Sequence, residues 1–261
     1  MIPGFDDLPA WTLAWIAGVM LLSGFIHGVI GLGFPIVAMP LLTLVLDLKT
    51  ALLVTVVPTF ALTVINSFRG GRLRESIGRF WYLPLCLAVG SYFGTRLLIV
   101  APGEPFLAVL ALMLLVYLNL ERLGAAQSAL VRAHPVPFAV AFGVAAGAFE
   151  AMVNVAGPVL LVFFMLAGIA PRSLVQAFNF SFILSKLVQV GTWTVAGGIG
   201  LAQWLLTVPW ALAACATLVV GWRLHDRASV ETYRRRLRAF MWVMAALLLA
   251  QFARAAWTKL G

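Results

Sequence analysis

The sequence predicts an all-α polytopic membrane protein that forms one integral membrane domain. Hydrophobic residues make up 63% of the chain and charged residues only 10%, whereas soluble globular domains carry about 25% charged residues. Two apolar segments, 11–46 and 136–168, are each interrupted by glycine and proline at corresponding places. Paired interruptions of this kind point to secondary transporters with inverted-topology repeats. The chain therefore divides into an N-terminal repeat, 1–124, and a C-terminal repeat, 125–261.

Each predicted repeat is a helical hairpin followed by three transmembrane helices. The interrupted segments are too long for one span of about 20 residues and too short for two. We expect each to return to its own side, because non-helical backbone at membrane depth is tolerated where protein or a water-filled cavity satisfies it. The other apolar segments have the length of single spans: 50–68, 80–100 and 105–120 in the first repeat, and 173–196, 202–221 and 239–257 in the second.

The distribution of basic residues sets the predicted orientation. With both interrupted segments treated as hairpins, 13 of the 18 lysine and arginine residues fall on one face of the membrane. The positive-inside rule assigns that face to the cytoplasm and leaves both termini periplasmic or otherwise extracytoplasmic. The basic residues sit in short loops between apolar runs, which indicates contact with anionic lipid and no nucleic-acid partner.

Lys186, near the middle of the segment 173–196, is the sharpest functional signal. A lysine at the bilayer centre costs about 2.5–3.5 kcal/mol on insertion scales, so a partner must offset that cost. Gln176, Asn179 and Gln189 fall on the same helix face, and amides around an ammonium suit an anionic solute. The alternative is a structural ion pair with Glu150, since buried cations are usually paired. The sequence leaves both readings open.

The corresponding helix of the first repeat, 50–68, carries threonines and an asparagine on one face. Thr63 is equivalent to Lys186 at the repeat offset of 123, and Asn66 is equivalent to Gln189. We expect Thr63 and Asn66 to supply neutral hydrogen-bonding groups to a substrate site. Hydrogen bonds that hold helices together are the alternative role, above all for the other threonines of this helix.

Each interruption contains one ionisable side chain, His27 in the first and Glu150 in the second. Either can carry a proton near the midplane, so both are candidates for proton coupling. The alternatives are a neutral His27 hydrogen-bonded to unwound backbone and a Glu150 paired with Lys186.

Glycines at the interruptions have a separate predicted role. Gly31, Gly33 and Gly157 leave backbone N–H groups open to a substrate, because no Cβ blocks the approach. A half-helix that starts at such a break points its positive dipole end at the ligand. Tight helix packing is the alternative use of these glycines. Asn154 stands at the position equivalent to Gly31, so we expect its side-chain amide to replace bare backbone there.

Residues 28–42, GVIGLGFPIVAMPLL, resemble the start of the TauE/SafE family, the sulfite-exporter or toluene-sulfonate-uptake-permease (TSUP) type. Residues 157–161, GPVLL, are similar to the second copy of this motif. The resemblance implies a transporter of the bacterial inner membrane that moves sulfite, sulfoacetate or a related organosulfonate, possessing no cofactor. Asn154 departs from the glycine cluster of the family, so the substrate of relatives is not carried over to this chain.

The runner-up is a permease for another small anion or an uncharged metabolite. A membrane-embedded enzyme or assembly factor is the alternative of a different class. Sequence patterns of zinc proteases, serine hydrolases and phosphate-binding loops are absent, so we expect neither enzymatic activity nor a metal site. The expected partners are a small anionic organosulfur substrate and the lipid bilayer.

The inverted topology is testable by labelling. Gly71 lies in a predicted cytoplasmic loop, and Gly198 lies between the spans 173–196 and 202–221. In a variant without native cysteines, a membrane-impermeant thiol reagent should label cysteines at these two positions from opposite sides of the membrane. Labelling of both from one side would contradict the inverted-repeat prediction.

Overall fold

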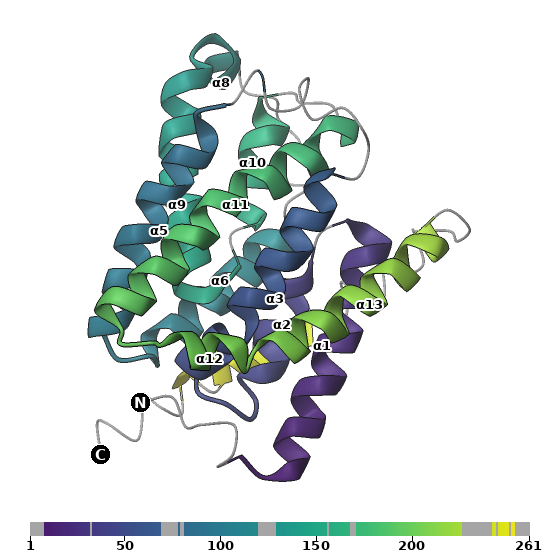
Figure 1. The fold of residues 1–261 in the computed structure, drawn as a ribbon. Coiled ribbons are helices and arrows are strands. Elements are labelled where there is room, and N and C mark those ends of the chain that lie inside the picture. The colour runs from purple at the N-terminus through teal and green to yellow at the C-terminus, as the bar shows by residue number, and fades with distance from the viewer. Residues whose placement is uncertain are drawn as a thin grey trace.

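The computed structural model is a bundle of helices (Figure 1), with no strand among the residues that it describes. Five stretches of these residues are long and apolar enough to cross a membrane: Ala10–Val29, Leu48–Phe68, Leu83–Val100, Pro135–Val153 and Leu201–Arg223. The predicted class, an all-α polytopic membrane protein, is therefore confirmed. The described residues are 8–31, 33–68, 78, 81–119, 129–155, 157–167, 171–225, 242–243, 245–250 and 252–253.

The helices follow the predicted segments. In the first half they are α1 (Ala10–Ile30), α2 (Phe34–Leu42), α3 (Leu48–Phe68), α5 (Leu83–Val100) and α6 (Pro105–Leu118). In the second half they are α8 (Ala129–Ala133), α9 (Pro135–Val153), α10 (Gly157–Leu166), α11 (Pro171–Ala196), α12 (Leu201–Leu205) and α13 (Val208–His225). The last predicted span, 239–257, lies only partly within the described residues, and most of the predicted basic loops lie outside them.

One predicted span is divided in the structure. The segment 202–221 contains α12 and α13, separated by a turn at Leu206 and Thr207. Pro209, at the start of α13, lacks the amide N–H that would continue the helix. The Thr207 hydroxyl donates to the carbonyl oxygen of Trp204 (2.7 Å), which satisfies one of the backbone groups that the turn frees.

Both interrupted segments fold back on themselves, as a hairpin requires. The Trp15 indole N–H, near the start of α1, donates to the carbonyl oxygen of Leu41, near the end of α2 (3.0 Å). In the second segment, Phe142 of α9 and Phe163 of α10 stack with ring centroids 5.8 Å apart. The arms are unequal, because α1 has 21 residues and α2 only 9. At 1.5 Å per residue, α1 is about as long as a bilayer core is thick and α2 is about half as long.

The long arms end in the same way at the two breaks. Gly31 has φ 81° and donates its N–H to the carbonyl oxygen of His27 (2.7 Å). Asn154 has φ 57° and donates its N–H to the carbonyl oxygen of Glu150 (2.7 Å). Glycine and asparagine are the residues that most readily adopt this left-handed conformation at the end of a helix. The sequence equivalence of Asn154 and Gly31 is thus also an equivalence of backbone conformation.

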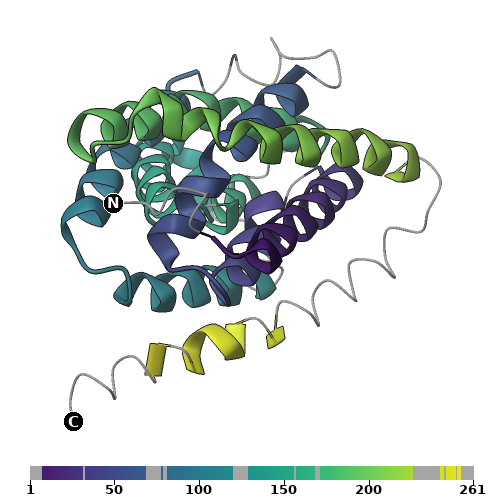
Figure 2. The same ribbon diagram turned by 60° about the horizontal axis from the view of Figure 1, so that its bottom comes forward.

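Glycines allow each long arm to pack closely against a helix of the other half. The arm α1 lies along α13 in Figure 1 and Figure 2, and α9 packs along α5. A Cβ at Gly24 would collide with the carbonyl oxygen of Ala214, and a Cβ at Gly147 with that of Leu87. These two contacts are equivalent, because Gly147 follows Gly24 by 123 positions and Ala214 follows Leu87 by 127. The offset of 123 is that of the sequence matches between the halves, and the offset of 127 also separates Glu104 from Glu231.

A second pair of glycines repeats the equivalence. A Cβ at Gly94 would collide with the carbonyl oxygen of Ala148, and a Cβ at Gly221 with that of Phe25. In Figure 1, α1 begins at the lower end of the bundle and α9 at the upper end. These observations favour the inverted-repeat reading, which stays a prediction.

The close approach at Gly147 predicts a sensitive position. We expect Gly147→Ala to lower the apparent unfolding temperature in detergent, because the new methyl group forces α9 away from α5 at a cost of about 1–3 kcal/mol. Gly191→Ala in α11 is the matched control, since a Cβ there meets nothing within 4 Å and gains the same helix propensity. Equal unfolding temperatures for the two variants would contradict the packing described here.

Candidate functional site

A cavity lies where the two breaks meet in the middle of the bundle. Its empty volume, including the part open to the outside, is about 480 Å³. Both breaks and the central helices α3 and α11 contribute to its wall. The lining residues are His27, Gly33, Pro35, Ile36, Thr59, Thr63, Glu150, Asn154, Gly157, Leu161, Phe178, Asn179 and Phe182.

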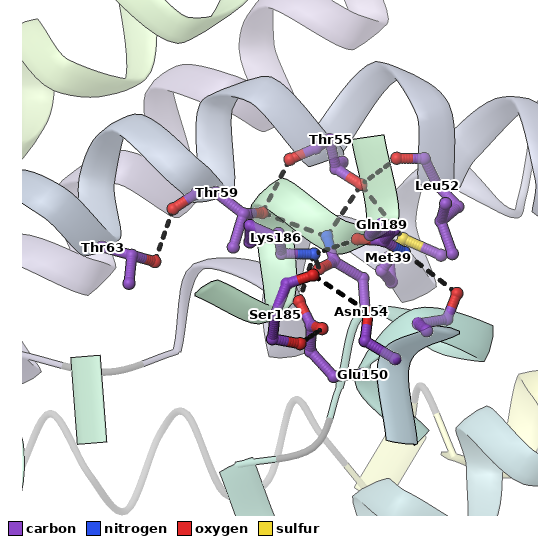
Figure 3. Close-up of polar contacts among 12 residues, drawn as sticks. Met39, Leu52, Thr55, Thr59, Thr63, Glu150, Asn154, Ser185, Lys186 and Gln189 are labelled. Atoms are coloured by element: carbon purple, nitrogen blue, oxygen red, sulfur yellow. Dashed lines mark hydrogen bonds and ion pairs between the residues drawn. The ribbon is translucent and has the colours of Figure 1, made fainter. Parts of the chain in front are cut away.

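Lys186 of α11 lies directly behind this wall and is completely buried (0% exposed). Its ammonium forms an ion pair with Glu150 Oε1. It also donates to Asn154 Oδ1 (2.6 Å) and to Gln189 Oε1 (2.8 Å). Figure 3 shows these side chains converging on Lys186 Nζ. The three hydrogens of the ammonium therefore have three acceptors, which offsets the cost of burying the charge.

Glu150 holds its carboxylate between the lysine and the cavity. While Oε1 pairs with Lys186, Oε2 accepts a hydrogen bond from the Ser185 hydroxyl (2.6 Å). Glu150 also contributes to the cavity wall. The ion pair that the sequence offered as one reading of Lys186 is therefore present, and its acidic member is a residue of the cavity wall. The two charges cancel at the site, so the cavity has no net charge from this pair.

Asn154 connects the second break to both central helices. Its Oδ1 accepts from Lys186 of α11, while its Nδ2 donates to the hydroxyl oxygens of Thr55 (2.9 Å) and Thr59 (3.0 Å) of α3. The residue at this position must adopt a positive φ and also present one acceptor and two donors. Asparagine meets both requirements, whereas glycine at the equivalent Gly31 meets only the first.

The threonines of α3 use their own protons within the helix. The hydroxyls of Thr55, Thr59 and Thr63 donate to the carbonyl oxygens of residues 51, 55 and 59, at 2.9, 2.6 and 2.6 Å. Their oxygen atoms are consequently acceptors toward the site. Thr55 and Thr59 accept from Asn154, which is the interhelical role foreseen for the other threonines of this helix, and Thr63 lies in the cavity wall.

His27 lies in the cavity wall at the first break. Its ring nitrogen Nδ1 accepts a hydrogen bond from the backbone N–H of Phe34, the first residue of α2 (3.2 Å). The bond spans the break between Ile30 and Phe34 and links the last turn of α1 to the start of α2. The sequence alternative for His27 was a neutral histidine hydrogen-bonded to unwound backbone, whereas the partner here is the first backbone N–H of α2.

The other predicted site residues divide into two groups. Gly33, Gly157 and Asn179 line the cavity with the residues already described. Asn179 also reaches the first break, where its Nδ2 donates to the Gly31 carbonyl oxygen (3.4 Å). A Cβ at Gly157 would press against the ring of Phe178 at 3.2 Å, so this glycine allows the aromatic wall to approach.

Three predicted residues are buried but not part of the cavity wall. Gln189 supports Lys186 and donates its Nε2 to the Ala151 carbonyl oxygen (3.0 Å). Gln176 donates to the carbonyl oxygen of Ser67 (2.9 Å), which joins α11 to the end of α3. Asn66 is also buried near that end of α3. Gln176 and Gln189 of α11 thus have partners on two different neighbouring helices, α3 and α9.

Sequence reasoning did not single out Ser185, Phe178 and Phe182. Phe178 and Phe182 form one aromatic wall with ring centroids 4.8 Å apart, and Ser185 holds Glu150. The spacing 178, 182, 185 is that of a single helical face, which was the available signal. Among the described residues no group of three or more His, Cys, Asp or Glu is placed to hold a metal ion.

The ion pair predicts a distinctive stability pattern. We expect Lys186→Met to lower the free energy of unfolding by about 3–5 kcal/mol, because it leaves the Glu150 carboxylate buried without a cation. The double variant Lys186→Met/Glu150→Gln should recover most of that loss, since the carboxylate is then neutral as well. Apparent unfolding temperatures of the three detergent-solubilised proteins test this. A double variant no more stable than Lys186→Met would refute the pairing.

Comparison with known proteins agrees with this geometry. The family model described as Sulfite exporter TauE/SafE matches residues 16–248, which is most of the chain and includes both breaks and both central helices. Searches of curated proteins and of solved structures found no match. With its apolar spans, its paired helix breaks and this match, the chain belongs to the TauE/SafE family of sulfite-exporter-type membrane transporters.

Proposed function

We propose that this protein is a secondary transporter that moves a small sulfur-containing anion, such as sulfite, sulfoacetate or a related organosulfonate, across the bacterial inner membrane. The observation that carries the proposal is the cavity at the junction of the two helix breaks, lined by His27 and Gly33 from one break and by Glu150, Asn154 and Gly157 from the other. Paired breaks at the centre of a transporter are where substrate and coupling ions bind. Membership of the TauE/SafE family supports the substrate class.

The chemistry of the wall suits an organic or inorganic oxyanion. The half-helices α2 and α10 begin at the cavity, next to Gly33 and Gly157, and the N-terminus of a helix favours negative charge. The rings of Phe178 and Phe182 provide an apolar surface for the carbon part of a sulfonate. Lys186 lies one side chain away from the cavity and supplies a positive charge, which the Glu150 carboxylate balances.

Inverted repeats would provide the mechanism of alternating access. The equivalent glycine contacts, Gly24 with Ala214 and Gly147 with Leu87, support two-fold pseudosymmetry between the halves. In such folds the two halves exchange conformations, so that a central site opens alternately to the two sides. Most basic residues of the predicted loops fall on one face of the membrane. The positive-inside rule favours a cytoplasmic location for that face and an extracytoplasmic location for both termini.

Glu150 is the proposed coupling group. A sulfonate stays ionised at physiological pH, so an entering substrate competes with the Glu150 carboxylate for Lys186. Loss of its cationic partner favours the protonated form of a buried carboxylate. Substrate and proton would then bind together, which gives symport or, in the opposite direction, proton-coupled export. The position of Glu150 in the cavity wall would let a proton reach this residue from the cavity.

The direct test is transport by the purified protein in proteoliposomes. Uptake of sulfite, sulfoacetate, other sulfonates, sulfate and an uncharged metabolite of similar size is measured with and without a pH gradient. The proposal expects selective uptake of one or more of the sulfur anions. Uptake of a different anion, or of the uncharged compound alone, would replace the proposed substrate class, and absence of any uptake would refute transport of these solutes.

The coupling role predicts the behaviour of Glu150→Gln. The glutamine mimics the protonated acid and retains an amide oxygen that can accept from Lys186, so the variant should bind substrate, although the unpaired Lys186 ammonium lowers its free energy of unfolding. We expect net transport by this variant to lose its response to an imposed pH gradient. Ser185→Ala is the matched control, because it removes a partner of Glu150 without changing the carboxylate. Full transport by Glu150→Gln with an unchanged pH response would exclude Glu150 as the coupling group.

A further inference from the structure

The two helix breaks place His27 and Glu150 at equivalent positions. The coupling scheme gives a role to Glu150 and none to His27. The side chain is buried (4% exposed) and lies in the cavity wall. Its Nδ1 is occupied by the Phe34 N–H, while its Nε2 has no hydrogen-bond partner among the described residues. A buried polar atom without a partner carries a free-energy penalty, which a ligand in the cavity removes.

The Phe34 contact determines which ring nitrogen carries the proton. A backbone N–H is always a donor, so Nδ1 must offer its lone pair. A neutral imidazole with a free lone pair on Nδ1 carries its hydrogen on Nε2. The doubly protonated ring has no lone pair to offer, and its Nδ1–H would oppose the Phe34 N–H. The break therefore favours one neutral tautomer, with Nε2–H as a hydrogen-bond donor.

Other side-chain donors of the cavity wall already make hydrogen bonds within the protein. The hydroxyl protons of Thr59 and Thr63 go to carbonyl oxygens of α3. The amide N–H groups of Asn154 go to two threonine hydroxyls, and Asn179 donates to the Gly31 carbonyl oxygen. An anion in the cavity needs donors, and Nε2–H of His27 is available without breaking an existing bond.

We propose that His27 is a substrate-binding residue, held as a fixed neutral donor whose Nε2–H bonds to an oxygen atom of the transported anion. The proposal rests on the anion transport proposed above and deepens it. It assigns different tasks to the two equivalent positions: His27 binds substrate oxygen, and Glu150 exchanges the proton. It differs from a relay role for His27, because a relay must gain and lose a proton at the ring, which the Phe34 contact opposes.

Two substitutions separate the nitrogen atoms of the ring. His27→Asn keeps an acceptor oxygen near the position of Nδ1, so the Phe34 bond is retained, but it places no donor at the position of Nε2. His27→Gln places an amide N–H near the position of Nε2. We expect His27→Asn to raise the KM for sulfite or sulfoacetate by about 10- to 100-fold, the usual effect of losing one hydrogen bond to a charged group. His27→Gln should recover a large part of that loss.

The same assays distinguish the competing roles. The response of transport to an imposed pH gradient should be unchanged in both variants. An unchanged KM in His27→Asn, while the wild type transports the anion, would overturn the His27 assignment and leave the transport proposal intact. Loss of the pH response with an unchanged KM would also overturn it, in favour of a relay. If the wild type transports none of the tested anions, both proposals fail together.

A measurement on the wild-type protein keeps the inference testable if either variant does not fold. The chain has three histidines, so ¹⁵N-histidine labelling gives few NMR signals, and His134→Gln and His225→Gln assign them by elimination. We expect the neutral Nε2–H tautomer at His27 and a shift of its Nε2 signal when sulfite is added. A proton on Nδ1, a charged ring, or no shift at sulfite concentrations that saturate transport would each refute the proposal.

Discussion

The buried ion pair of Lys186 and Glu150 is the constraint on which the centre of this protein depends. A charged lysine in the middle of a bilayer is expensive unless every hydrogen of the ammonium has an acceptor. Here the acceptors come from the end of α9, from the break that follows it and from the next turn of α11. The second break is therefore held against α11 by these contacts. Through Asn154 the same network also fixes the position of α3.

Close helix packing supports this central network from outside. The arms α1 and α9 approach α13 and α5 so closely that glycine is required on one or both helices. Without a hydrophobic driving force between helices in lipid, such contacts of small residues provide much of the association energy. Each arm is anchored on a helix from the other half of the chain, and the two breaks are brought together at the cavity. The helix packing and the polar network thus both determine where the two helix breaks lie.

The site combines local neutrality with strong polarity. Its lysine and glutamate cancel, its threonines present oxygen atoms, and its half-helices begin at the cavity. Under the proposed anion transport, a permanently positive site would hold the substrate too firmly for release, and a permanently negative one would exclude it. A balanced pair that the substrate can divide would avoid both extremes, because the affinity would then depend on where the proposed coupling proton resides. A neutral donor such as the proposed Nε2–H of His27 would add affinity without disturbing that balance.

The sequence by itself determined the class of the protein and the positions of most helices, and it singled out Lys186, Glu150 and Asn154, which the structure brings together. Hydropathy is a local property, so spans such as α3 and α5 were readable directly. The cost of an intramembrane charge identified Lys186, and the repeat offset identified Asn154 as the counterpart of Gly31. The sequence could not decide whether Lys186 binds substrate or forms a structural ion pair. The helix face of a residue indicates the direction of its side chain but not the group that the side chain contacts.

Only the tertiary structure decided those partners. It paired Lys186 with Glu150, directed Gln176 to the end of α3, and kept Lys186 just behind the cavity wall. It also made the hairpin arms unequal and gave His27 a bond to the backbone of α2. Each of these features depends on the distance and rotation between helices that are far apart in the chain. Those quantities follow from packing at positions such as Gly24 and Gly147, where the spacing between helices is set by the absence of a side chain.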